Sequence, residues 1–266
     1  MALHYIDLNC DLGEYTNSDE ERKERAIMPA ITSANIACGG HTGDQRSMRR
    51  TITCALEHSV AIGAHPSFVD RINFGRVEMD VPDKKLQDIV HRQISELIEH
   101  ATGLGGRVSH VKAHGALYNL AARNIDTALT FCEVVARIDS DLLIYGLANS
   151  NWVAAAKQLE LRVAEEVFSD RRYLTPDSLV PRTMENALIT SVDDSVRQIL
   201  GMIHERVVEC IDGLRYPINA DTICVHGDGE HALEFVKHLR ATLAEEGLEV
   251  CHPVSGDNLS DSLFRL

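Results

Sequence analysis

Seven short apolar stretches recur along the chain, and each ends in polar or glycine-rich residues before a helical stretch follows. They lie at residues 5–9, 33–38, 60–65, 108–114, 142–147, 162–168 and 222–226. Strands that alternate with helices are joined by crossovers and therefore run parallel. Seven such units predict an α/β fold, a closed (β/α)7 TIM-like barrel that forms one catalytic domain over residues 1–266. An open, doubly wound sheet is the alternative.

Helical periodicity is clearest in two segments, where apolar side chains recur at spacings of three and four. These are residues 84–101 and 230–247, and Gly247 is the expected stop signal of the second. Further helices are expected at residues 44–59, 119–137, 149–160 and 193–211.

Polar side chains occupy inward-facing positions of five predicted strands. Alternate strand residues face opposite sides of a sheet, and the side that packs on helices must be apolar. In residues 5–12 this requirement turns Asp7, Asn9 and Asp11 inward. The same reasoning turns inward Asn35, His65, His110, Lys112, His114, Cys224 and His226. Residues 142–147 are apolar on both faces. Burying an unpaired polar group costs about 1–3 kcal/mol, so this set predicts either a satisfied hydrogen-bond network or a functional site.

Histidine and acidic residues gather at the C-terminal ends of the predicted strands, where active sites of such barrels form. Histidine titrates near neutral pH and suits general acid–base catalysis, with carboxylates as bases or orienting groups. Lys112 is expected to stabilise developing negative charge. The predicted catalytic residues are Asp11, Glu14, His65, Lys112, His114, Asp170, His226 and Asp228.

A divalent metal is the competing use of these side chains, and the spacing leaves this open. We expect no metal; if one binds, its ligands are Asp11, His65, His114 and His226. His110 and His114 lie about 13 Å apart along one strand and cannot share an ion. The sequence holds neither a GxxxxGK[ST] loop nor a GxSxG elbow, which disfavours a P-loop nucleotide site and a serine hydrolase.

Charge and targeting signals narrow the functional classes further. The chain has 26 Lys and Arg against 40 Asp and Glu, a formal net charge of −14, which argues against nucleic-acid and membrane partners. No apolar run approaches the roughly 20 residues of a membrane span, and the N-terminus lacks a signal-peptide pattern. Seven cysteines without a CxxC pair argue against a disulfide framework. We therefore expect a cytoplasmic protein.

Several long segments of the chain resemble the LamB/YcsF family. The matching segments are IDLNCDLGE (6–14), SANIACGGHTGD (33–44), VAIGAHPSFVDR (60–71), NFGR (73–76), HVKAHGALYN (110–119), EEVFSDRRY (165–173), SLVPR (178–182) and VHGDGEHAL (225–233). They occur in order from residue 6 to about residue 250. Cys10, Gly40 and Ala113 stand where the family commonly has Ala, Phe and Pro, but the ionisable residues are retained.

The resemblance implies a barrel like that of the glycoside hydrolase/deacetylase superfamily. It also implies the activity of the A component of an ATP-dependent 5-oxoprolinase, a cyclic amide hydrolase that opens 5-oxo-L-proline to L-glutamate with separate B and C subunits. Phosphorylation of the amide oxygen would make the ring carbon electrophilic for attack by water. ATP is consumed by the complex, and the missing P-loop favours a nucleotide site on a partner subunit.

On this reading one group of residues binds substrate, and Lys112 and the arginines supply positive charge for the phosphate. The expected binding residues are Asn9, Asn35, His41, Asp44, Asn119, Arg76, Arg171 and Arg182. Two alternatives stay open: a metal-dependent amidase or deacetylase acting alone, and a non-catalytic protein that binds a lactam or carbohydrate. The oligomeric state is also open, a homo-oligomer included.

Overall fold

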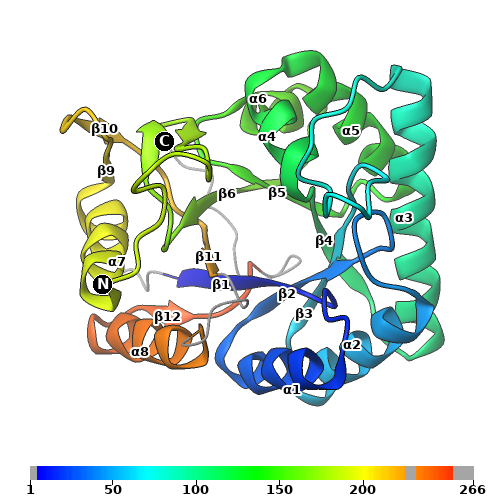
Figure 1. Cartoon of the computed structure of the whole chain (residues 1–266), viewed down its shortest axis with the longest axis horizontal. Coiled ribbons are helices and arrows are strands. Elements are labelled where there is room, and N and C mark those ends of the chain that lie inside the picture. Colours follow the sequence, from blue (N-terminus) through cyan, green and yellow to red (C-terminus); the bar gives the residue numbers. More distant parts are fainter. Residues whose placement is uncertain (1–4, 226–231, 254–266) are drawn as a thin grey trace.

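Seven parallel strands close into a barrel in the computed structural model, which describes residues 5–225 and 232–253 (Figure 1). The strands are β1 (Tyr5–Leu12), β2 (Ser33–Ala37), β3 (Ala61–His65), β4 (Val108–Lys112), β5 (Leu143–Leu147), β6 (Val163–Phe168) and β11 (Thr222–Val225). They pair in this order, and β11 closes the ring by pairing with β1, where Asn9 lies opposite Cys224. The closed barrel predicted from the sequence is confirmed, and the open sheet is wrong.

Helices surround the ring of strands (Figure 1). They are α1 (Ser18–Ile27), α2 (Gln45–Glu57), α3 (Asp83–Gly103), α4 (Gly115–Arg123), α5 (Ile125–Ile138), α6 (Asn151–Gln158), α7 (Val192–Leu200) and α8 (Ala232–Glu245), with a 3-10 turn at Met28–Ala30. Most of the predicted apolar stripe of α3 is buried, including Val90, Ile94 and Leu97, whereas Ile89 and Ile98 at its margins are half-buried. No helix in the described ranges is both long and apolar enough to cross a bilayer.

Two predicted helices differ from the structure. Residues 119–137 form parts of α4 and α5 rather than one helix, because Asn124 is extended and its side chain accepts a hydrogen bond from the Thr127 amide to cap α5. The helix predicted over 193–211 ends at Leu200 and continues as a π-helical turn, Gly201–Glu205. Arg206 then takes a left-handed conformation with φ of 54°, which ends the helical stretch before a strand begins.

Short elements that the sequence analysis did not predict lie outside the seven units. The chain between β6 and α7 forms a hairpin of β7 (Tyr173–Thr175) and β8 (Ser178–Leu179). A second hairpin joins β9 (Val207–Glu209) to β10 (Arg215–Pro217), and β12 (Glu249–Val250) pairs with the start of β1. Helix α1 was also missed; its sequence SDEERKERAI contains few apolar residues, so it shows no clear apolar stripe.

The barrel interior near the N-terminal ends of the strands is polar, as predicted, and its polar groups are paired by hydrogen bonds. The fully buried Asp7 accepts hydrogen bonds from hydroxyls of Thr32 (2.6 Å), Ser33 (2.7 Å), Tyr145 (2.9 Å) and Thr222 (2.5 Å). Burial raises the pKa of Asp7, although these donors oppose the shift. Tyr145 corrects the expectation that residues 142–147 contribute only apolar groups, because its ring is buried while its hydroxyl reaches Asp7.

Gly63 on β3 leaves room in the barrel interior for the side chain of His110 on β4. A Cβ atom at position 63 would overlap the imidazole ring of His110, which stacks on Tyr145 with ring centroids 4.2 Å apart. The Nε2 atom of His110 donates a hydrogen bond to Asn35 Oδ1 at 2.9 Å. We expect Gly63→Ala to destabilise the protein by about 1–3 kcal/mol, because overpacking a close-packed core displaces its side chains. Denaturant unfolding measures this loss.

Gly103→Ala is the matched control. Gly103 lies at the exposed end of α3, and a Cβ atom there meets no atom within 4 Å. Alanine at this position should leave stability unchanged or raise it slightly. Equal stability of the two variants would contradict the packing role of Gly63.

Candidate active site

A cavity of about 1010 Å³ opens at the C-terminal ends of the strands, where the sequence analysis placed the site. One group of lining residues comes from β1, β3 and β4 and the segments that follow them: Asp11, Glu14, His65, Lys112 and His114. Another group comes from later segments and includes Tyr118, Asn119, Arg171, Leu179 and Arg182. Residues from distant parts of the chain therefore meet around one space, as predicted.

Lys112 forms ion pairs with two carboxylates in the part of the cavity that Asp11, Glu14, His65 and His114 line. Its side chain is almost fully buried, and its ammonium group lies 2.9 Å from Asp11 Oδ1 and 2.8 Å from Glu166 Oε1. The ammonium also contacts Asn9 Oδ1 at 3.2 Å and Cys224 Sγ at 3.2 Å. Burial alone would lower the pKa of Lys112, but the anionic neighbours, Asp11 first, hold the pKa well above its ordinary value. Lys112 therefore stays charged and fixes the Asp11 carboxylate.

Asn9 and Asn35 lie beneath Asp11 rather than in contact with the cavity. Asn35 Nδ2 donates to Asn9 Oδ1 at 2.7 Å and to Asp11 Oδ1 at 2.8 Å, while Asn9 Nδ2 donates to Glu166 Oε1 at 2.9 Å. Both amides are fully buried, and neither lines the cavity. The expected substrate-binding role of these two residues is thus replaced by a role in positioning Asp11 and Glu166.

The tautomers of His65 and His114 are fixed by backbone carbonyls. His65 Nδ1 donates to the Lys112 carbonyl at 2.8 Å, and His114 Nε2 donates to the Phe74 carbonyl at 2.9 Å. A carbonyl only accepts, so each of these nitrogens carries a hydrogen. The other two nitrogens, His65 Nε2 and His114 Nδ1, face one another at 3.1 Å, and His65 Nε2 also lies 3.3 Å from Asp11 Oδ2. One proton or a cation must lie between these groups.

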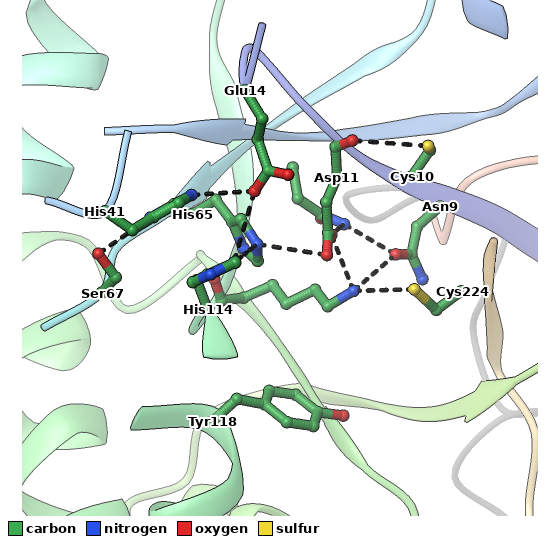
Figure 2. A network of polar contacts seen from close by, with 12 residues as sticks. Asn9, Cys10, Asp11, Glu14, His41, His65, Ser67, His114, Tyr118 and Cys224 are labelled. Atoms are coloured by element: carbon green, nitrogen blue, oxygen red, sulfur yellow. Dashed lines mark hydrogen bonds and ion pairs between the residues drawn. The ribbon is translucent and has the colours of Figure 1, made fainter. Parts of the chain in front are cut away.

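His41 is fixed in the same manner by a serine hydroxyl. Ser67 Oγ donates to the Phe68 carbonyl at 2.9 Å, so it accepts from His41 Nδ1, also at 2.9 Å. The low pKa of His41, about 2, keeps its imidazole neutral, so Nε2 is an acceptor, and it lies 2.9 Å from Glu14 Oε1. Figure 2 shows His41, His65 and His114 gathered around the Glu14 carboxyl group, with Asp11 beside them. Two acceptors at this distance need a hydrogen between them, which places a proton on Glu14.

The pKa shifts of Glu14 and of the three histidines agree with a proton on Glu14. Burial raises the pKa of Glu14. Burial, and next the neighbouring His65, lowers the pKa of His41 to about 2, while burial and His41 lower the pKa of His114 to about 3. Burial also opposes the charge on His65, but Asp11 outweighs it and raises the pKa of His65. The directions of these shifts favour a proton on Glu14, neutral His41 and His114, and a positive charge on His65 beside Asp11.

Further residues support the site that the sequence analysis did not single out. The Glu24 carboxylate on α1 accepts hydrogen bonds from the backbone amides of Gly13 (2.7 Å) and Glu14 (3.0 Å) and so holds the loop that carries Glu14. Tyr118 donates to Glu166 Oε2 at 2.6 Å. Glu166 is an inward residue of β6, and the alternation test applied to residues 162–168 would have found it. No sequence signal identifies Glu24, because its role depends on where α1 packs.

The remaining predicted residues divide into three groups. Asn119, Arg76, Arg171 and Arg182 line the cavity, and Asp170 and Asp44 are not among its lining residues. The Asp44 side chain accepts the Ser47 amide at 2.8 Å and caps α2, so it serves the helix rather than a ligand. His226 and Asp228 lie outside the described residues.

Asp11, His65 and His114 also fit a divalent metal. Their ligand atoms lie within 4.8 Å of one another. The separations of 3.1 Å and 3.3 Å are those expected of neighbouring ligands about 2.1 Å from one ion. The other ring nitrogen of each histidine donates a hydrogen bond to a backbone carbonyl, which is also typical of metal-binding imidazoles. The geometry thus accommodates either a shared proton or a metal ion.

Comparison with known proteins identifies close relatives of the chain. The sequence pattern of the LamB/YcsF family matches residues 6–257. A Bordetella pertussis protein that is named as the A subunit of 5-oxoprolinase is 44% identical over 245 residues, which are 92% of this chain and 97% of the relative. The crystal structure of a lactam utilization protein from Thermus thermophilus superimposes with a TM-score of 0.85 at 35% identity, covering 93% of this chain and 99% of the other.

A more distant likeness concerns the fold alone. The catalytic domain of a peptidoglycan N-acetylglucosamine deacetylase from Eubacterium rectale gives a TM-score of 0.51 at 9% identity, covering 96% of this chain and 90% of the other. The expected similarity to the deacetylase barrel is confirmed by this likeness.

Nitrogen-15 NMR of the histidines in metal-free protein tests the proton count. At pH 5, below the ordinary histidine pKa of 6.5, we expect His41 and His114 to remain neutral because their pKa values are lowered to about 2 and 3. His65 should be cationic and should lose its proton only above pH 6.5, because its pKa is raised. His41→Gln and His114→Gln assign the signals. Protonation of His41 or His114 near pH 6.5 would contradict the arrangement.

Proposed function

The chain belongs to the LamB/YcsF family, and on that premise we propose that it is the A component of an ATP-dependent 5-oxoprolinase. In this role it opens the ring of 5-oxo-L-proline to give L-glutamate. The observation that carries the proposal is the linked set of Asp11, His65, His114 and Glu14 in the wall of one cavity. The names of the Bordetella and Thermus relatives support the lactam as the substrate class.

Opening a lactam requires a proton acceptor and a proton donor. Water adds to the ring carbonyl carbon and loses a proton, the carbon–nitrogen bond breaks, and the ring nitrogen gains a proton as it leaves. A site with an ionised carboxylate and a protonated carboxyl can serve both ends of this reaction. Asp11 and Glu14 meet this requirement, because Lys112 holds Asp11 ionised and His41 holds a proton on Glu14.

We assign Asp11 as the general base and Glu14 as the general acid. The side chains of both are partly open to the cavity, 16% exposed for Asp11 and 19% for Glu14. Lys112 acts as a positioning residue, since its three hydrogens are shared among four neighbours, Asp11, Glu166, Asn9 and Cys224. The imidazolium of His65 adds positive charge beside the reacting carbonyl.

ATP is expected to act through the complex. An amide is a poor electrophile, and phosphorylation of its oxygen makes the ring carbon reactive. The sequence holds no P-loop, so we propose that the nucleotide binds to a partner, the B or C component, and that this chain receives the activated lactam. Water then adds to the ring carbon, the carbon–nitrogen bond breaks as the nitrogen gains a proton, and hydrolysis of the resulting acyl phosphate by a second water gives glutamate and inorganic phosphate.

A metal-dependent amidase is the second candidate, because the geometry of Asp11, His65 and His114 favours it. Those three residues would hold the ion, which when bound polarises a carbonyl as a Lewis acid. Under this alternative Glu14 keeps its place as the proton donor, held by His41.

Glu14→Gln tests the proposed general acid. The glutamine amide can still donate a hydrogen to His41 Nε2, so the fold should be retained, but it has no proton to transfer. We expect kcat for ring opening to fall about 10²–10⁴-fold. Glu20→Gln, an exposed position at the cavity's edge, is the matched control and should keep wild-type activity. Wild-type turnover by Glu14→Gln would remove Glu14 from the mechanism.

Glutamate release separates the two candidates. With 5-oxoproline, ATP and the B and C proteins, we expect glutamate, and omission of ATP or of the partners should abolish it. Asp11→Asn should also abolish turnover, whereas a protein that only binds the lactam would change in affinity alone. Stoichiometric metal in protein purified without added metal, together with ATP-independent cleavage of simple amides, would establish the amidase instead.

A further inference from the structure

Arg171 presents a buried guanidinium group to the cavity. It follows β6, lines the cavity, and is only 7% exposed. Its Nη2 atom donates to the Val180 carbonyl at 2.6 Å, but its Nε atom has no hydrogen-bond partner. A buried donor that lacks a partner costs free energy, and a buried charge costs more. The position is therefore unfavourable unless a ligand completes it.

A second guanidinium group lies close to Arg171. Burial, and next the positive charge of Arg182, lowers the pKa of Arg171 to about 10. Arg182 also lines the cavity, in the segment after the β7–β8 hairpin. Two cations on one wall repel each other and raise the local positive potential.

Two other cations that line the cavity are balanced by carboxylates. Lys112 pairs with Asp11 and Glu166, and Arg123 pairs with Glu78 at the edge. Within residues 5–225 and 232–253, Arg171 has no carboxylate at ion-pair distance. Among the described residues, Arg171 therefore differs from Lys112 and Arg123 in having no carboxylate within ion-pair distance, although the charge of Asp170 acts on it from farther away.

We infer that Arg171, with Arg182 beside it, forms a subsite for an oxyanion group of the ligand. A guanidinium group offers a planar fork of donors that matches two oxygens of a carboxylate or phosphate. The inference deepens the proposed function and rests on it for the identity of the ligand: 5-oxoproline carries a carboxylate, and its activated form carries a phosphoryl group. The cavity of about 1010 Å³ has room for such a group beyond the ring.

Binding to the full chain alone tests the subsite without turnover. Calorimetry measures the affinity of wild type, Arg171→Met and Arg171→Lys for inorganic phosphate, for 5-oxoproline and for its uncharged carboxamide. We expect the affinity of Arg171→Met for inorganic phosphate or for 5-oxoproline to be about tenfold or more below that of the wild type. The affinity of Arg171→Lys should lie between the two, because lysine keeps the positive charge but not the planar fork of donors. Arg123→Gln is the matched control in the same cavity and should bind as wild type.

Thermal unfolding separates a ligand role from a structural one. Replacing a buried, unpartnered charge by an apolar side chain should leave the melting temperature of unliganded Arg171→Met unchanged or raised. Phosphate or 5-oxoproline should stabilise the wild type but not this variant. If affinity is lost only for 5-oxoproline, the anion is the substrate carboxylate; if it is lost only for phosphate, the anion is the phosphoryl group.

Three results would overturn the inference. They are wild-type affinity of Arg171→Met for both anions, binding of neither anion to the wild type, and a loss of affinity matched by a clear loss of unliganded thermal stability. Glutamate release by the complex is measured separately, so a failure of the proposed reaction is distinguishable from a failure of this subsite.

Discussion

The buried ammonium of Lys112 is the interaction on which the rest of the site depends. Without its positive charge, the carboxylate of Asp11 and the fully buried carboxylate of Glu166 would lie close together with no cation between them. Breaking a buried ion pair in this way typically costs about 3–5 kcal/mol. The same charge keeps Asp11 ionised at the surface of the cavity. The stability of the barrel and the charge of the proposed base, Asp11, therefore both depend on one side chain.

The imidazole groups are ordered by the backbone and by one hydroxyl. The Lys112 and Phe74 carbonyls fix His65 and His114, and Ser67 fixes His41. Each ring then turns a defined nitrogen towards a carboxyl group, so protons have few places to reside. This preorganisation requires no reorientation of the rings when charge develops during a reaction.

Sequence periodicity was sufficient for the barrel and for much of the site, because both follow from alternation along parallel strands. Asp11, His65, Lys112 and His114 meet as expected, since strand ends of a closed barrel share one rim. Asn9 and Asn35 lie one layer too deep to meet a ligand, a difference in height that alternation does not encode. Glu24 and the β7–β8 hairpin were missed because their places are set by tertiary packing. Glu166 follows from the same alternation, because it shares a face of β6 with Ala164 and Phe168 while Glu165 lies on the other face.

The cavity is lined by two separate parts of the chain, because the β7–β8 hairpin lies between β6 and α7 and contributes to one wall. The proton-handling groups come from β1 to β4 and the segments that follow them, whereas Leu179 and Arg182 come from this hairpin or its flank. Substitutions in this hairpin would alter one wall of the cavity and leave the buried network of Asp11, Lys112 and the histidines in place. The two walls can thus change independently of one another.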